Sequence, residues 1–99
     1  MALVTGQDGR RLLAITANGE GAPFQIIGDY HDVFIWGTFG AGPTLVKFQL
    51  SPFKTGEWFD MYSVSAKTLN AGVRFGHMSW ARFVISAADG STSVNAVFN

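Results

Sequence analysis

Residues Val33–Phe59 read VFIWGTFGAGPTLVKFQLSPFKTGEWF, and in this block apolar runs are separated by Gly, Pro and a Ser-Pro turn. Runs rich in β-branched and aromatic residues that end at such breaks are typical of β-strands. The block contains no acid–base pair, no group of metal ligands and no phosphate-binding loop. It therefore predicts three consecutive antiparallel strands and says little by itself about function.

The first two of these strands differ in their pattern. Thr44–Ser51 alternates cleanly, and its inward positions are Val46, Phe48 and Leu50. A slip of one residue in pairing would bury Lys47, so the register of this strand is well determined. In Val33–Phe39 both alternating sets are apolar, which predicts a central strand with both faces at least half buried and with Trp36 in the core.

The same pattern of breaks continues on both sides of the block. The further strands that we predict are Arg11–Ala17, Phe24–Ile27, Trp58–Val64, Leu69–Phe75, Ala81–Ala87 and Ser93–Phe98. Asn18-Gly19 predicts a tight turn, Glu20–Pro23 a loop, and Asp89-Gly90 the turn of a hairpin between the last two strands. About seven or eight strands at this spacing predict an all-β fold, an antiparallel two-sheet β-sandwich of jelly-roll or immunoglobulin-like type.

Alternation also predicts the inward residues of the later strands, which are Phe83, Ile85, Val94, Ala96 and Phe98. In Trp58–Val64 the pattern places Phe59, Met61 and Ser63 on one face and Trp58, Asp60, Tyr62 and Val64 on the other. It does not indicate which of these two faces is the core.

A chain of 99 residues is one domain with a modest core. We divide it into a flexible N-terminal arm, residues 1–9, and a single β-sandwich domain, residues 10–99. The basic pair Arg10 and Arg11 follows the arm. The pair is either the solvated start of the first strand or part of an arm that becomes ordered on a neighbouring subunit, where Leu3 and Val4 supply apolar contacts.

Composition excludes several classes of function. Lys+Arg and Asp+Glu number 7 each, so the chain lacks the basic surface that nucleic-acid binding requires. No apolar run approaches the ~20 residues of a membrane span, and the N-terminus has no signal-peptide pattern, so we expect cytoplasmic synthesis and no membrane partner. With no cysteine, 14% charged and 47% apolar residues, the chain is typical of a small domain that gives part of its apolar surface to a partner, as in an oligomer.

Two groups of polar residues have the types needed for chemistry. Asp29, His31 and Asp32 could hold a metal or act as an acid–base group, but they lie between apolar runs, where Asp and His commonly cap a turn. The chain also contains the three residue types of a nucleophilic catalytic triad, in His77, Ser79 and Asp89. However, no Gly-x-Ser-x-Gly elbow surrounds the serine. We therefore expect no enzymatic activity, no metal and no cofactor.

The remaining tryptophans are candidates for surface contacts. Trp58 follows a turn beside Glu57, and Trp80 follows Met78 and Ser79 just before a strand. An exposed indole can anchor a protein interface or stack on a sugar ring. The candidate interface residues are Leu3, Val4, Arg10, Arg11, Trp58, Met78 and Trp80.

Three short segments resemble a pattern found in small tailed-phage virion proteins: Ile35–Gly40, Thr44–Val46 and Leu50–Pro52. In that family an aromatic-Gly-Thr-Phe-Gly strand end leads into Thr-Val-x-Leu and then a Ser-Pro-Asp-Gly-Gly turn with a following Trp, near whose position Trp58 lies. Ile85-Ser86 and Thr92–Val94 are similar to the closing hairpin of the family, so the resemblance runs from Val33 to the end. The chain departs from the pattern at 53–57, where Phe-Lys-Thr-Gly-Glu replaces Asp-Gly-Gly and leaves the turn type open.

The resemblance implies a structural protein of the virion. The leading hypothesis is a decoration (cement) protein on the capsid exterior, with the major capsid protein as partner and with a homo-oligomer, guessed to be a trimer from capsid symmetry. The alternative is a carbohydrate-binding or adhesion module of the tail or fibre, in which Trp58 and Trp80 are exposed and coplanar and Asp60 or Gln49 bind sugar hydroxyls.

Overall fold

The computed structural model describes residues 9–27, 30–40, 44–55, 57–65, 69–74 and 79–99, and for Tyr30 and residues 69–74 it describes the backbone. The described residues form nine strands, which are β1 (Arg11–Ile15), β2 (Gly19–Glu20), β3 (Phe24–Gln25), β4 (Tyr30–Thr38), β5 (Leu45–Ser51), β6 (Phe59–Ser65), β7 (Leu69–Arg74), β8 (Trp80–Ser86) and β9 (Ser93–Phe98). No helix capable of crossing a bilayer occurs within these ranges.

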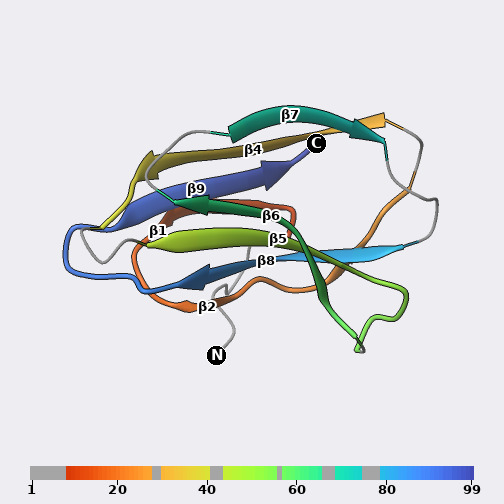
Figure 1. Cartoon of the computed structure of the whole chain (residues 1–99), viewed down its shortest axis with the longest axis horizontal. Coiled ribbons are helices and arrows are strands. Elements are labelled where there is room, and N and C mark those ends of the chain that lie inside the picture. Colours follow the sequence, from red (N-terminus) through yellow and green to blue (C-terminus); the bar gives the residue numbers. More distant parts are fainter. Residues whose placement is uncertain (1–8, 28–29, 41–43, 56, 66–68, 75–78) are drawn as a thin grey trace.

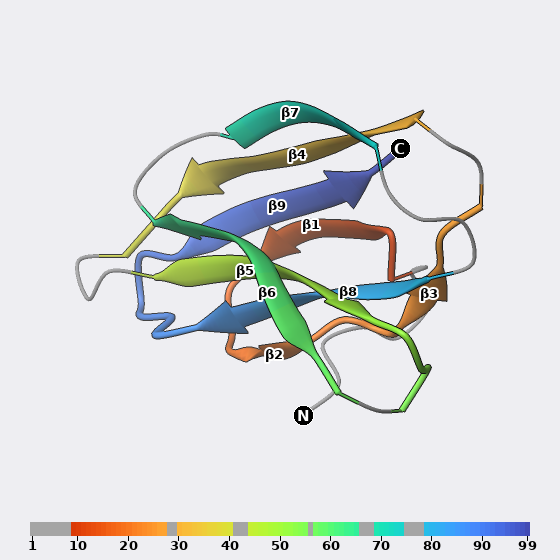
Figure 2. The same cartoon turned by 45° about the vertical axis from the view of Figure 1, so that its right-hand side comes forward.

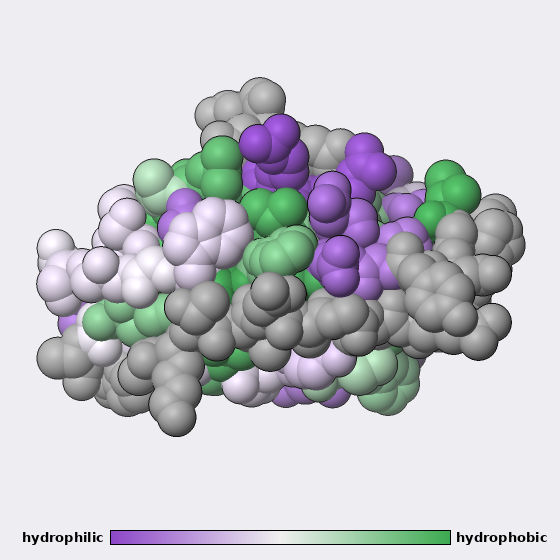
Figure 3. Space-filling model, turned by 90° about the horizontal axis from the view of Figure 1, so that it is seen from above, coloured by the Kyte–Doolittle hydropathy of each residue, from purple (hydrophilic) through white to green (hydrophobic). Residues whose placement is uncertain are grey.

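The strands form two antiparallel sheets that pack face to face. The first sheet has the order β1-β9-β4-β7, and the second has the order β2-β8-β5-β6, with β3 also paired to β8 (Figure 1). The predicted all-β antiparallel sandwich is confirmed. Figure 2 shows the two layers turned by 45°, and Figure 3 views the molecule from the side on which β7 and β4 lie.

The strand order identifies the sandwich as a jelly roll. β2 and β3 lie along the same strand, β8, and the Gly21 amide between them donates to the Phe83 carbonyl at 2.8 Å, so they are two halves of one interrupted strand. Counted in this way there are eight strands, and the first pairs with the eighth, the second with the seventh, the third with the sixth and the fourth with the fifth. This is the pairing of one long hairpin wound into two sheets, which distinguishes the jelly roll from the immunoglobulin-like alternative.

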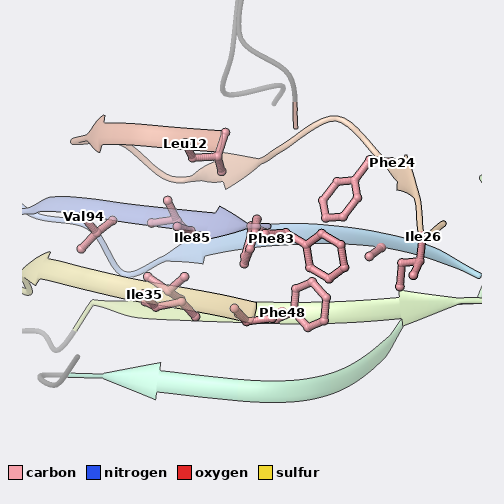
Figure 4. Packing of buried hydrophobic residues seen from close by; sticks show 13 residues of the cluster. Leu12, Phe24, Ile26, Ile35, Phe48, Phe83, Ile85 and Val94 are labelled. Atoms are coloured by element: carbon pink, nitrogen blue, oxygen red, sulfur yellow. The ribbon is translucent and has the colours of Figure 1, made fainter. Parts of the chain in front are cut away.

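The core lies between the sheets and is centred on aromatic rings. Phe48 of β5 stacks on Phe98 of β9 with centroids 5.6 Å apart, and it packs at 5.2 Å against Phe83 of β8 (Figure 4). The buried apolar residues are Leu12, Phe24, Ile26, Val33, Ile35, Val46, Phe48, Ala81, Phe83, Ile85, Val94, Ala96 and Phe98. The inward residues predicted for the last two strands are confirmed, as are Val46 and Phe48; Leu50 is half-buried and packs against this core.

The predicted hairpin between the last two strands is wrong. β8 belongs to the second sheet and β9 to the first, so residues 87–92 cross from one sheet to the other. The turn itself forms, with the Thr92 amide donating to the Asp89 carbonyl at 3.2 Å. A local turn signal fixes a reversal of the chain, but it does not determine which sheet the next strand joins. Ala87, with a φ of +57°, directs the chain out of the second sheet.

The predicted burial of Trp36 is also wrong. Val33 and Ile35 face the core, so Trp36 and its neighbours at alternate positions point away from it. Trp36 is 38% exposed and Phe34 is half-buried, because the described structure places no second layer over this face. β4 is central, as predicted, since it pairs with both β7 and β9.

β6 changes faces part-way along its length. Phe48 pairs with Tyr62 and the next residue, Gln49, pairs with Asp60, so Met61 is an extra residue that forms a β-bulge. Tyr62 and Val64 therefore pack against the core while Asp60 points outward. The prediction that Asp60 shares a face with Tyr62 and Val64 is corrected by this bulge.

Several element boundaries differ from the predictions, and two of these differences concern residues that the sequence analysis placed in loops or turns. Gly19 and Glu20 form the short strand β2, although Glu20 was expected in a loop. β4 begins at Tyr30, so His31 and Asp32 lie in a strand and not in a turn. The backbone of Asp32 exchanges two hydrogen bonds with Asn99, which extends the pairing of β4 with β9 beyond the predicted strand start.

Candidate binding surface

The outer face of the first sheet carries a group of apolar side chains. Val97 of β9 pairs with Phe34 of β4, and both point outward because their chain neighbours face the core. Trp36 lies two residues along β4 from Phe34, and Leu13 follows the inward-facing Leu12 on β1. We call Leu13, Phe34, Trp36 and Val97 the apolar face.

The side chain of Asn95 ties together the three strands that carry the apolar face. Its Nδ2 donates to the Trp36 carbonyl at 3.3 Å, and its Oδ1 accepts a hydrogen bond from the Ala14 amide at 2.9 Å. Ala14 has a φ of +52° and lies in a bulge between Leu12 and Ile15. The Asn95 amide group therefore satisfies the backbone amide at the bulge and fixes the position of β1 beside Trp36.

The apolar face has a polar rim. Arg11, which is exposed, pairs with Val97 across β1 and β9, and Thr38 of β4 is exposed beyond Trp36. Asp32 is exposed at the other end of β4. An aromatic and aliphatic centre with a polar margin is the usual anatomy of a protein–protein interface.

The outer face of the second sheet is different, because its polar side chains bind one another. Arg82 donates to Glu20 at 2.9 Å and to Gln49 at 2.8 Å, Gln49 donates to Asp60 at 2.8 Å, and Lys47 lies 3.2 Å from Asp60. We call these residues (Glu20, Arg82, Gln49, Asp60 and Lys47) the polar ladder. The hydrogen bond from Gln49, together with Lys47, lowers the pKa of Asp60 below its ordinary value.

The two tryptophans predicted for surface contacts lie on this second face, and both are half-buried. The Arg82 guanidinium lies 4.3 Å from the centre of the Trp58 ring, and the Lys54 ammonium lies 5.6 Å from that of Trp80. Gln49 and Asp60, the expected hydrogen-bond partners of a sugar, bond to each other. A sugar stacked on the same face of Trp58 would have to displace Arg82 from the polar ladder.

The groups with potential for chemistry do not assemble in the described structure. His31 stacks on Phe98 with ring centroids 4.6 Å apart, and no three metal-ligating side chains come together among the described residues. Ser79 and Asp89 lie beyond opposite ends of β8, so the predicted triad types are separated by the length of a strand. Leu3, Val4, Asp29, His77 and Met78 lie outside the described residues.

No protein-family model matches this chain, and neither a curated protein nor a solved structure does. A proposal for the function of this chain therefore has to be argued from the chemistry of its surfaces.

Sequence reasoning missed the apolar face, although a signal for it was present. It placed Phe34, Trp36 and Thr38 together on one side of a strand, but it assumed that a second layer covered that side. Leu13 and Val97 were not singled out, because each is an isolated apolar residue in its own strand. Their proximity follows from the pairing of β1, β9 and β4, which the sequence does not reveal.

Proposed function

We propose that this chain is a structural protein of a tailed-phage particle, a capsid decoration protein whose apolar face binds the outer surface of the major capsid shell. The observation that carries the proposal is the contrast between the two outer faces. One presents Leu13, Phe34, Trp36 and Val97, whereas the polar side chains of the other bond to one another. An exposed aromatic residue on a central strand, with further apolar side chains beside it, favours a protein partner.

The phage assignment comes from the resemblance in Ile35–Gly40. Trp36 of that segment supplies the exposed ring of the apolar face, and Gly37 places β4 close to β9. The jelly roll is a fold used by viral capsid proteins as well as by lectins, so it supports the assignment by analogy of fold. No catalytic step forms part of this proposal.

The mechanism would be thermodynamic linkage. A protein that binds only the expanded shell stabilises that state at each site by RT ln(1 + [L]/Kd), which is about 2.7 kcal/mol when its free concentration is one hundred times Kd. Summed over many sites, this free energy opposes disruption of the shell by the packaged DNA. The predicted homo-oligomer, guessed to be a trimer, would add contacts between neighbouring copies on the shell.

The test uses capsids assembled without the protein, to which purified protein is added. We expect Trp36→Ser to bind capsids at least about tenfold more weakly than the unmodified chain, and its urea unfolding curve reports whether the variant has folded. Phe53→Ser is the matched control, because Phe53 is an exposed aromatic residue on the turn between β5 and β6, away from the apolar face.

Two results would contradict the proposal. The first is equal binding by Trp36→Ser and the unmodified protein. The second is that capsids without the protein withstand heat and chelation as well as capsids that carry it.

A further inference from the structure

One end of the sandwich contains a pocket of about 330 Å³, at the start of β1 and the end of β9. Its lining residues come from four separate parts of the chain and are Arg10, Arg11, Gln25, Ile27, His31, Phe98 and Asn99. We call this the end pocket. None of the described residues that line it belongs to the polar ladder, and neither Trp58 nor Trp80 is among them.

The charge of the lining favours an anion. Arg11, one of the chain's 7 cationic side chains, lines the pocket together with Arg10, and none of the lining residues that the structure describes is an aspartate or a glutamate. The described ion pairs, Lys47–Asp60 and Arg82–Glu20, lie on the outer face of the second sheet and do not involve Arg11. A guanidinium offers paired N–H donors that match a carboxylate or a phosphate.

The remainder of the lining suits a small hydroxylated ring. Gln25 and Asn99 each carry an amide that both donates and accepts hydrogen bonds. Ile27, which is 67% exposed, and the half-buried imidazole of His31 provide apolar contact area. A pocket of about 330 Å³ is at the small end of the range for ligand sites, which limits the ligand to about one ring with its substituents.

Backbone hydrogen bonds join three of the segments that line the pocket. The Phe98 amide donates to the Arg10 carbonyl at 2.8 Å, and the Asn99 amide donates to the Asp32 carbonyl at 2.9 Å. His31 is stacked on Phe98, whose ring is buried in the core. These contacts join the start of β1, the end of β9 and the start of β4, so ligand binding would require little ordering of the protein.

We propose that the end pocket binds an acidic monosaccharide, that is, a carboxylate or phosphate group carried on a sugar ring. Arg11 binds the oxyanion, Gln25 and Asn99 bind ring hydroxyls, and Ile27 and His31 contact the face of the ring. This site is separate from Trp58 and Trp80, where the alternative glycan hypothesis had placed the sugar. The proposal does not depend on the capsid assignment.

The experiment is an NMR titration of the ¹⁵N-labelled protein with glucuronate, glucose 6-phosphate and glucose, and separately with acetate and inorganic phosphate. We expect saturable shifts at Gln25, His31 and Asn99 with glucuronate, glucose 6-phosphate or both, and affinities at least about tenfold weaker for glucose and for the two simple anions. The ratio of the affinities for glucuronate and glucose 6-phosphate identifies the preferred oxyanion as a carboxylate or a phosphate.

Arg11→Gln is the test variant, and its spectrum reports whether it has folded. We expect it to weaken binding of the acidic sugar at least about tenfold, and Arg11→Lys, which keeps the charge but not the paired donors, to weaken it less. Lys54→Gln is the control, because it removes one positive charge beside Trp80, away from the pocket. Equal binding by Arg11→Gln, equal affinity for acetate or phosphate alone, or no shift with either acidic sugar would each overturn the proposal.

Discussion

Gly37 of β4 lies against the backbone of β9, with a φ of +131°. A Cβ at this position would be 2.3 Å from the carbonyl oxygen of Ser93 and 3.0 Å from the Cα of Val94, so the backbones would have to separate. We expect Gly37→Ala to lower the free energy of unfolding by about 2–3 kcal/mol, as measured by urea denaturation. Gly90→Ala is the control, since a Cβ there meets no atom within 4 Å, and a similar loss in both variants would contradict this account.

Thr44 joins two segments that are distant in sequence. Its buried hydroxyl accepts a hydrogen bond from the Gly40 amide at 2.9 Å and lies 2.8 Å from the Thr92 hydroxyl. Thr44→Val keeps the shape but leaves the Gly40 amide without this acceptor, so we expect a loss of about 1–3 kcal/mol in denaturant unfolding. The same change at the exposed Thr38 should be nearly neutral. If the two variants were equally stable, the hydroxyl contacts would not contribute as described.

Asp60 makes stability depend on pH. Because its pKa is lower in the folded protein than the ordinary value of 3.8, folding favours the ionised carboxylate. Its stabilising effect is therefore fully present above pH 3.8 and is lost as the pH falls through the lower folded-state pKa. We expect Asp60→Asn to be less stable than the unmodified protein at neutral pH, and the two unfolding curves to converge in acid. A difference that did not change with pH would show that the hydrogen bond to Gln49 acts without the charge.

At the scale of secondary-structure elements, the bulge in β6 is the clearest departure from regular alternation. Deleting Met61 leaves Gln49 opposite Asp60 and Phe48 opposite Tyr62, so each residue keeps its face. We expect this deletion to change stability by less than about 1 kcal/mol in denaturant unfolding.

Deletion of Ser63 is the control for this prediction. Removing a residue after the bulge turns Val64 away from the core against which it packs, at a cost of about 1–2 kcal/mol. If the Met61 deletion were the more damaging of the two, the assignment of Met61 as the extra residue would be wrong.

Alternation predicted the elements whose two faces differ in polarity. In β8 and β9 every second residue is buried, and in β5 Val46 and Phe48 are buried and Leu50 is half-buried, so the inward sets could be predicted from the alternation. Alternation failed in β6, because one extra residue inverts the pattern, and in β4, because an apolar residue such as Trp36 can face either a second layer or a partner. The Asp89-Gly90 turn led to the prediction that β8 and β9 form one hairpin, because a local turn does not reveal which sheet each strand joins.

At the scale of the whole molecule, the sites depend on that sheet order. The end pocket brings together Arg11, Gln25, His31 and Phe98, which lie on four strands of two sheets. Of these, the sequence analysis named Arg11 and His31 as candidates for function and Phe98 as a core residue, each for a different reason, because no local pattern connects residues separated by most of the chain. The low charge and high apolar content predict a surface that faces a partner, which stays a prediction, and they do not give the location of that surface.

The wound hairpin also predicts slow folding. β1 pairs with β9, so the first and last strands meet only after the whole chain has come together, and the other long-range pairs are nested inside this one. Proteins dominated by such pairings fold in milliseconds to seconds. We expect refolding from urea, followed by tryptophan fluorescence in a stopped-flow instrument, to fall in this range or slower. Refolding within microseconds would contradict the described topology.

The position of β9 between β1 and β4 has a consequence for biosynthesis. When a nascent polypeptide has left the ribosome as far as β8, both neighbours of β9 are present but β9 itself is not. In this state β1 has no partner in its sheet, and the inner surfaces around Leu12 and Ile35 lack Val94 and Ala96. Assembly of the first sheet must therefore wait until translation has passed Phe98. Until then, the incompletely folded chain exposes apolar surface that chaperones bind and that favours aggregation when chaperones are scarce.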